Sequence, residues 1–187
     1  MIKFVYFDVG GVLIKDFSKT DKWNELKIDL KINDPNFDVW FDDLEAKLLI
    51  GKASFENTKL TLNDFVSRFE MNPSIWPIVK EIKKKYRVGL LTGMYSGMLD
   101  AIFKSGVMPE IEWDVIVDSS VFGFKKPNIE IYKIAEEKAG FLGEEILFVD
   151  NTKKNLETAQ SLGWQTFLYD SSDYVGSTEK LRTLNLG

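Results

Sequence analysis

Apolar residues along this chain fall into short runs that are separated by amphipathic stretches. Five runs of mostly β-branched and aromatic residues predict buried strands over residues 2–7, 87–91, 114–117, 146–149 and 165–169. Apolar positions at helical spacing predict helices between these strands, over Ile75–Lys85, Gly97–Lys104, Ile129–Lys138 and Lys154–Leu162. Because strands and helices alternate, the pattern predicts an α/β fold with a central parallel sheet that is covered on both faces.

Residues 15–73 interrupt this alternation. They are rich in charge, and apolar residues occur in them at helical spacing, namely Val39, Phe41, Leu44, Leu48 and Leu49. Further apolar residues are expected to pack in the same segment: Trp23, Leu26, Leu30 and Phe37. We therefore expect a small α-helical cap over residues 15–73, inserted into a core formed by residues 1–14 and 74–187. Most cap aromatics are expected to be core residues, with Trp40 and Phe41 as the candidates for contact with a substrate.

Polar residues stand where three of the predicted strands end. Asp8 follows the first strand, Thr92 follows the second and Asp150 follows the fourth. In open α/β sheets the carboxyl ends of the strands share one edge, and ligands bind at that edge. A carboxylate there can act as a nucleophile, as a metal ligand or as both. The three residues therefore predict a reactive centre at this edge of the sheet.

Two further motifs add a turn and a cation. Gly10 and Gly11 follow Asp8 and allow a sharp turn in which the backbone comes close to a ligand. Lys126 lies in a Lys-Pro-Asn sequence just ahead of a predicted helix. Two carboxylates can hold a hard Mg²⁺ ion through oxygen ligands. The metal and the lysine together would neutralise a phosphate, to which a hydroxyl would donate a hydrogen bond.

Each candidate also has a purely structural interpretation. Asp150 is suited to cap the helix that follows it, Lys126 to be a surface lysine beside a turn, and Thr92 to be an ordinary strand-end residue. Asn155 has two interpretations that the sequence leaves open, as a helix-surface residue or as a hydrogen-bond partner of the Asp150 loop. Lys125 is expected to face solvent.

The order and spelling of these motifs resemble the haloacid dehalogenase (HAD) superfamily, whose members are mostly phosphatases. The nearest match is its subfamily I, which has a small helical (C1-type) cap after the first strand. The resemblance covers nearly the whole chain and is tightest over residues 2–14, 73–93 and 110–169. It implies a Rossmann-like, three-layer core with a central parallel sheet, plus the inserted cap.

This resemblance implies a role for each motif residue. Asp8 matches the nucleophile that forms an aspartyl-phosphate, and it also binds the metal. Thr92 matches the phosphate-binding hydroxyl, and Lys126 matches the lysine that steadies the nucleophile and the phosphate. Asp150 matches the acidic Mg²⁺ ligand, and Gly10 offers its backbone carbonyl to the same ion. The loops that contact the substrate include three glycines: Gly10, Gly11 and Gly93.

The chain departs from the pattern of the superfamily at three positions. Most of its phosphatases have a second aspartate, the general acid/base, where this chain has Gly10. Asn151 stands where a second carboxylate is common, and Gly93 where relatives often have asparagine. General acid–base catalysis contributes typically about 10² to 10⁴ in rate. The Asp-x-Gly-Gly spelling recurs in the small-cap subfamily, so it does not by itself mark an inactive protein.

Composition narrows the choice of chemistry. The 187 residues are 44% hydrophobic and suit one ordinary domain with an insertion. A net charge of −5 gives no general attraction to nucleic acid or to an anionic membrane. The chain has no cysteine and no histidine, which excludes disulfides, thiolate chemistry and Ser-His-Asp hydrolysis. The N-terminal apolar run is broken by Asp8 and leads into the predicted fold, so no signal peptide is expected. No stretch approaches 18 uninterrupted apolar residues, so no transmembrane helix is expected, and a cytoplasmic location is the simplest expectation. The tail Ser171–Gly187 is expected to end in a short helix, with Leu181 and Leu184 docked on the core.

The sequence therefore predicts Mg²⁺-dependent hydrolysis of a small phosphomonoester through an aspartyl-phosphate. One alternative is a weak or silent member that binds a phosphorylated ligand or partner, because Gly10 and Asn151 lack acidic side chains. Another is cleavage of a C–halogen or C–P bond. Asp150 argues against metal-free halide chemistry, and C–P cleavage would need a cap lysine, for which three are candidates by position: Lys15, Lys47 and Lys52. The substrate and the oligomeric state are not defined by the sequence.

Overall fold

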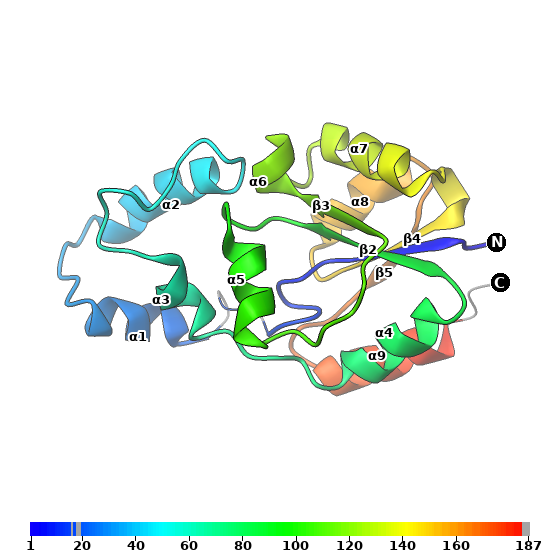
Figure 1. Ribbon diagram of the computed structural model, residues 1–187, viewed down its shortest axis with the longest axis horizontal. Coiled ribbons are helices and arrows are strands. Elements are labelled where there is room, and N and C mark those ends of the chain that lie inside the picture. The colour runs from blue at the N-terminus through cyan, green and yellow to red at the C-terminus, as the bar shows by residue number, and fades with distance from the viewer. Residues whose placement is uncertain (16, 18–19, 185–187) are drawn as a thin grey trace.

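The computed structural model describes residues 1–15, 17 and 20–184. Its centre is one five-stranded sheet in the order β3-β2-β1-β4-β5, in which every neighbouring pair is parallel. The strands are β1 Phe4–Phe7, β2 Arg87–Thr92, β3 Val115–Asp118, β4 Ile146–Asp150 and β5 Gln165–Leu168. Helices lie on both sides of this sheet, so the predicted three-layer α/β fold is confirmed (Figure 1).

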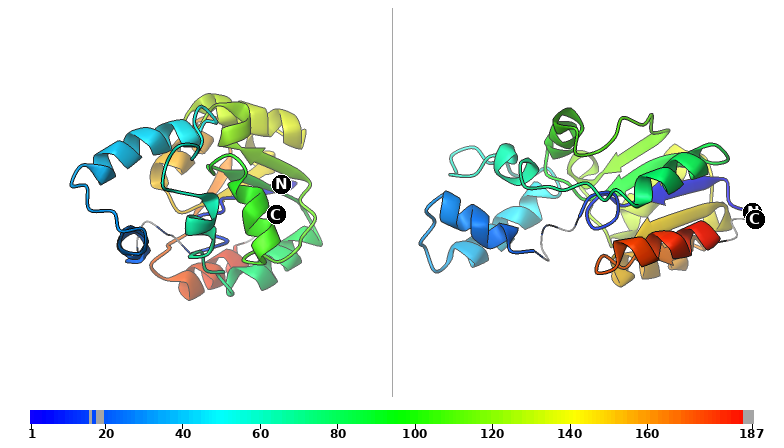
Figure 2. Two further views of the ribbon diagram at one scale, coloured as in Figure 1. Left: turned by 60° about the vertical axis from the view of Figure 1, so that its left-hand side comes forward. Right: turned by 90° about the horizontal axis from the view of Figure 1, so that it is seen from below.

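Two helical layers cover the sheet (Figure 1, Figure 2). One layer contains α4 Ile75–Lys83, α5 Met98–Ser105 and α9 Tyr174–Thr183. The other contains α7 Ile129–Ala139 and α8 Lys153–Ser161, with the short α6 Ser119–Phe122 next to them. A single 3₁₀ turn, η1 Gly143–Glu145, leads into β4.

The central strand β1 is buried on both faces, which explains its continuous apolar run. Val5 and Phe7 belong to the hydrophobic cluster under α4, α5 and α9. Phe4 and Tyr6 belong to the cluster under α7 and α8. All four side chains are fully buried, and the Tyr6 hydroxyl donates a 2.8 Å hydrogen bond to the Ala135 carbonyl. Alternating side chains thus fix the strand between the layers.

Three helices are inserted between β1 and α4, and we call them the inserted helices: α1 Lys22–Asp29, α2 Phe37–Leu48 and α3 Leu62–Val66. They lie together at one end of the molecule, beyond the sheet (Figure 1). Aromatic rings join them, with centroids 4.6 Å apart for Trp23 and Phe41 and 5.9 Å apart for Phe41 and Phe65. A bridge between Ile14 and Met71 brings the outgoing and returning segments side by side. The boundaries of a separate cap at residues 15–73 stay a prediction.

Most differences from the expected elements concern their ends. The first strand begins at Phe4 instead of residue 2, and α4 ends at Lys83. In the tail, α9 forms and Leu181 is buried, but Leu184 is 38% exposed, so its expected docking on the core is wrong. Residues 185–187 lie outside the described residues.

The inserted helices lie opposite the start of β1 and the end of α9. β1 begins and α9 ends at the end remote from α1 and α2 (Figure 1, Figure 2). Within the described residues, no helix combines the length and apolar character needed to cross a bilayer.

Candidate active site

The site lies where the order of the strands reverses. From β1 the chain proceeds to β2 and β3 on one side of the sheet, then crosses to β4 and β5 on the other. Phe7 pairs with Val149 across β1 and β4, so the next residues, Asp8 and Asp150, are neighbours at the carboxyl edge. Such a switch point leaves a crevice between the strand ends, which is where open α/β sheets bind ligands.

Lys126 joins the two carboxylates. Its Nζ lies 2.9 Å from Oδ1 of Asp8 and 2.7 Å from Oδ2 of Asp150, and its side chain is only 7% exposed. The loop that carries it is held by Asn128, whose side chain accepts the Glu130 N–H at the start of α7. Lys126 is therefore not a surface residue, whereas its neighbour Lys125 is exposed as expected.

Asp150 is held by a set of donors from the start of α8. Its Oδ1 accepts the Thr152 N–H at 2.7 Å, and Nδ2 of Asn155 lies 3.2 and 3.1 Å from its two oxygens. The Asn155 carbonyl in turn accepts a 2.9 Å hydrogen bond from the Tyr132 hydroxyl. The question that the sequence left open is thus settled: Asn155 is a buried partner of Asp150.

The electrostatics of this trio favour a fixed ammonium and leave excess negative charge. Burial alone would lower the pKa of Lys126, but the nearby Asp150 and Asp8 charges outweigh it, and the pKa rises. Burial raises the pKa of Asp8, and the charge of Lys126 opposes that effect. With both carboxylates ionised, two negative charges face one ammonium in a buried place. Buried charges are stable only when they are paired, so the site favours an additional cation.

Thr92 contributes a buried hydroxyl that has no partner. Its side chain is 1% exposed at the end of β2, the strand next to β1. Within the described part of the chain, Thr92 Oγ1 makes no hydrogen bond. Leaving such a group unsatisfied costs about 1–3 kcal/mol. The Thr92 hydroxyl is thus available to donate a hydrogen bond at this edge of the sheet.

The two glycines after Asp8 differ in what they require. Gly11 has a φ of +77°, and a Cβ placed on it would lie 1.9 Å from Nδ2 of Asn151, so only glycine fits. A Cβ on Gly10 would meet no atom within 4 Å. Space around position 10 therefore does not require glycine, although the sequence predicted that both glycines serve the turn. Asn151 packs against the Gly11 loop.

A cavity of about 210 Å³ opens beside these loops, between the sheet edge and the inserted helices. Gly10 and Gly93 both line it, together with the charged residues Lys15 and Glu45. The rest of its lining is mostly apolar or aromatic and includes Ile14, Phe17, Leu49, Phe65 and Tyr95.

Two residues of this cavity were not singled out by the sequence. Glu45 of α2 accepts a hydrogen bond from the hydroxyl of Tyr95, which follows β2. Burial, and then the Glu45 charge, raise the pKa of Tyr95 further above its usual range, so its hydroxyl stays a neutral donor.

Of the two cap aromatics proposed to face a substrate, Phe41 lines an adjoining cavity of about 190 Å³, whereas Trp40 is 43% exposed and lines neither cavity.

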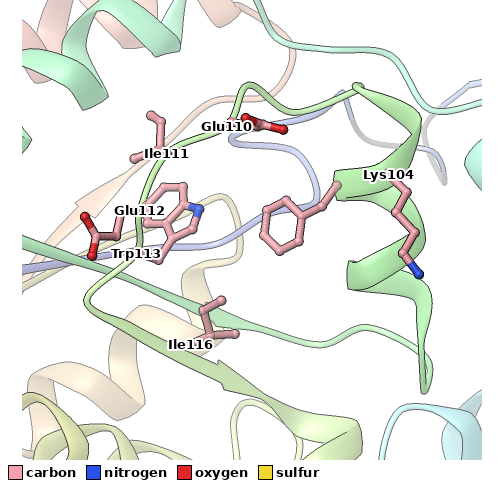
Figure 3. A pocket seen from close by; sticks show the side chains of 7 residues that line it. Lys104, Glu110, Ile111, Glu112, Trp113 and Ile116 are labelled. Atoms are coloured by element: carbon pink, nitrogen blue, oxygen red, sulfur yellow. The ribbon is translucent and has the colours of Figure 1, made fainter.

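A separate cavity of about 520 Å³ lies along the edge strand β3 (Figure 3). Its walls come from α5, from the Glu110–Trp113 segment and from Ile116. None of the predicted site residues lines it. We therefore place the candidate active site at the carboxyl edge and not here.

Comparison with known proteins identifies the family of the chain. The sequence profile of the haloacid dehalogenase-like hydrolases matches residues 2–163. The chain belongs to this family. It is therefore a member of a hydrolase family, as the motifs predicted, and its curated relatives are phosphatases.

Two curated HAD relatives are each 26% identical to the chain. The D-ribitol-5-phosphate phosphatase of Bacteroides thetaiotaomicron aligns with 89% of this chain and 91% of its own length. The glyceraldehyde 3-phosphate phosphatase of Methanocaldococcus jannaschii aligns with 73% of this chain, which spans 62% of that longer protein.

Solved HAD structures share the fold. A HAD-like family hydrolase from Porphyromonas gingivalis superposes with a TM-score of 0.78 at 22% identity and covers 99% of this chain and 100% of its own. A HAD family enzyme from B. thetaiotaomicron, solved with magnesium and inorganic phosphate, gives 0.76 at 22% identity and covers 91% of this chain and 96% of its own.

Proposed function

We propose that this HAD protein hydrolyses a small phosphomonoester in a Mg²⁺-dependent reaction, through a phosphorylated Asp8. The observation that carries the proposal is the buried Asp8–Lys126–Asp150 trio beside the unpartnered hydroxyl of Thr92. The two curated relatives, both phosphatases of small phosphorylated compounds, support the same reaction class.

Asp8 is the group suited to attack phosphorus. Its Oδ1 is held by the Val9 N–H at 2.7 Å and by Lys126 at 2.9 Å. Oδ2 accepts no hydrogen bond from the described residues, which leaves it as the attacking atom. Attack forms the Asp8–phosphorus bond and breaks the ester P–O bond, and the leaving oxygen departs with the bonding pair and takes up a proton from water. Water then hydrolyses the acyl phosphate, which releases phosphate and restores Asp8.

Lys126 and Thr92 would stabilise the transferred phosphoryl group. The ammonium of Lys126 lies between both carboxylates and is positioned to offset charge that develops on the phosphoryl oxygens. Thr92 Oγ1 would donate its free hydrogen bond to one of those oxygens. Its buried state means that it would be ready before the substrate arrives and would need no rearrangement.

The same residues fit a magnesium ion. Asp8, Asp150 and the Gly10 carbonyl are hard oxygen donors, and the two carboxylates exceed the single ammonium by one charge. Among the described residues no group of three or more acidic side chains is placed to hold a metal ion, so water and substrate oxygens would complete the shell. When bound, Mg²⁺ would neutralise phosphoryl charge and hold the group in line with Asp8.

A silent, ligand-binding protein is the second candidate, because neither Gly10 nor Asn151 supplies an acid. C–P cleavage is less well supported. Lys15 lines the 210 Å³ cavity, but its ammonium is ion-paired with Glu70 at 2.7 Å and is thus not a free amine. C–halogen cleavage without a metal would give the buried Asp150 carboxylate no role as a metal ligand.

The test is a phosphatase assay of the wild type and of Asp8→Asn, with and without Mg²⁺. Substrates would be p-nitrophenyl phosphate and a panel of alkyl, sugar and nucleotide monophosphates. We expect Mg²⁺-dependent phosphate release by the wild type and a complete loss in Asp8→Asn, whose amide keeps the shape but cannot attack. Undiminished turnover by Asp8→Asn would refute the covalent mechanism. Absence of release from every substrate would favour the silent protein.

A further inference from the structure

The 210 Å³ cavity contains a carboxylate, that of Glu45, which has no cationic partner among the described residues. Glu45 lines this cavity, and its side chain has one recorded partner among the described residues, the neutral hydroxyl of Tyr95. No lysine or arginine of the described chain lies within ion-pair distance of Glu45. The other charged lining residue, Lys15, is already neutralised by Glu70 at 2.7 Å.

Aromatic side chains line the cavity next to the Glu45 carboxylate. Phe65 and Tyr95 are buried, and their ring centroids lie 5.5 Å apart in an edge-to-face arrangement. Phe17 lines the same cavity and packs 5.8 Å from Phe65. Glu45 is partly buried beside these rings, and a partner of opposite charge would stabilise its carboxylate there. Ring faces also attract ammonium groups, which they bind through their electron-rich π surface.

We propose that the leaving group of the substrate carries an ammonium group, held between the Glu45 carboxylate and the aromatic walls of this cavity. This inference rests on the proposed phosphatase function, because the phosphate end would lie at Asp8. The cavity is smaller than the roughly 300–1,000 Å³ of pockets for drug-sized ligands, so the leaving group is a small amino alcohol. A polyol fits less well, because its hydroxyls would face Ile14, Leu49 and Met94, which offer no side-chain hydrogen bonds.

A substrate with an ammonium group would also compensate for the missing general acid at Gly10. An alkoxide leaving group needs stabilisation as the P–O bond breaks, and the chain offers no acid at position 10. An ammonium group two carbons from the leaving oxygen makes that oxygen less basic through its positive charge. The substrate itself would then supply part of the stabilisation of the leaving oxygen that an aspartate provides in other members of the superfamily.

The experiment compares phosphocholine and phosphoethanolamine with neutral analogues of the same shape. The analogue of phosphocholine is 3,3-dimethylbutyl phosphate, and that of phosphoethanolamine is n-propyl phosphate. The kcat/KM ratio of each cationic substrate to its analogue would be measured for the wild type, for Glu45→Gln and for Asp43→Asn. Glu45→Gln keeps an oxygen that accepts from Tyr95 and loses only the charge. Asp43 is an exposed acid of α2 that lines neither cavity, which makes it the matched control.

We expect wild-type ratios well above one and a fall of about tenfold or more in Glu45→Gln, with the main change in KM and with Asp43→Asn unchanged. A larger fall for phosphocholine would identify a quaternary ammonium, and one for phosphoethanolamine a primary amine. If p-nitrophenyl phosphate is hydrolysed but the ratios do not respond to Glu45→Gln, the inference is wrong and the phosphatase function stands.

If no ester is hydrolysed, calorimetry tests the ammonium site separately from the phosphatase function. In that case the proposed function fails, and phosphocholine would be titrated into the wild type and Glu45→Gln in the presence of Mg²⁺. Weaker binding by Glu45→Gln would keep the ammonium site as the property of a binding protein. Equal binding, or none, would overturn it.

Discussion

Replacement of Gly10 by aspartate tests whether a general acid is the only catalytic group that this HAD protein lacks. The backbone permits the change, because a Cβ at position 10 meets no atom within 4 Å and Gly10 is not in the left-handed region. We therefore expect Gly10→Asp to fold, with some loss of stability in the absence of Mg²⁺ because the new carboxylate joins the negative charges of Asp8 and Asp150. By contrast, Gly11→Ala should lose at least about 1–2 kcal/mol, because it combines a left-handed φ with a 1.9 Å overlap on Asn151.

The gain in rate should depend on the leaving group. A nitrophenolate hardly needs a proton when it departs, whereas an alkoxide does. Positioned acid catalysis contributes about 10² to 10⁴, so Gly10→Asp should raise kcat/KM for alkyl phosphates by up to that factor and for p-nitrophenyl phosphate by much less. Conversely, the wild type should favour aryl over neutral alkyl phosphates.

The assay measures kcat/KM for n-propyl and p-nitrophenyl phosphate with the wild type, Gly10→Asp and Gly10→Asn. Asparagine matches aspartate in size and has no acidic proton, so it controls for the side chain itself. Thermal unfolding of each variant establishes that it is folded. If the alkyl-to-aryl ratio is the same in Gly10→Asp and Gly10→Asn, then protonation is not limiting, or another group already supplies the proton.

Two further substitutions test the other parts of the site. Thr92→Val removes a buried hydroxyl that has no partner among the described residues, so the melting temperature should be unchanged or higher. We expect kcat/KM to fall roughly 10- to 100-fold, because a hydrogen bond to a charged group is worth about 1.5–3 kcal/mol. A lower melting temperature with full activity would show that the hydroxyl serves the fold and not the site. Asp150→Asn should weaken Mg²⁺ binding measured by calorimetry, because it removes one of two carboxylates; unchanged affinity would exclude Asp150 as a ligand.

The strand ends explain why so much of the site was predictable. Asp8, Thr92 and Asp150 each terminate an apolar run, and parallel strands bring such ends to one edge whatever the details of packing. The motif resemblance added Lys126, which no periodicity could place because it comes from a loop. Its 7% exposure results from contacts with two residues that are distant in the sequence.

The wall of the cavity could not be predicted in the same way. Helix α2 carries several acids, and Asp42, Asp43 and Glu45 look alike in sequence. Only the rotation of the helix against Tyr95 selects Glu45, and that rotation is set by tertiary packing. Leu184 illustrates the same limit at the tail, since apolar character alone placed it on the core.

The positions of the chain ends bear on how the protein can be handled. Because β1 begins and α9 ends opposite the inserted helices, anything attached at either end points away from the carboxyl edge (Figure 2). An enzyme anchored to a surface through that end would keep its crevice open to the solution.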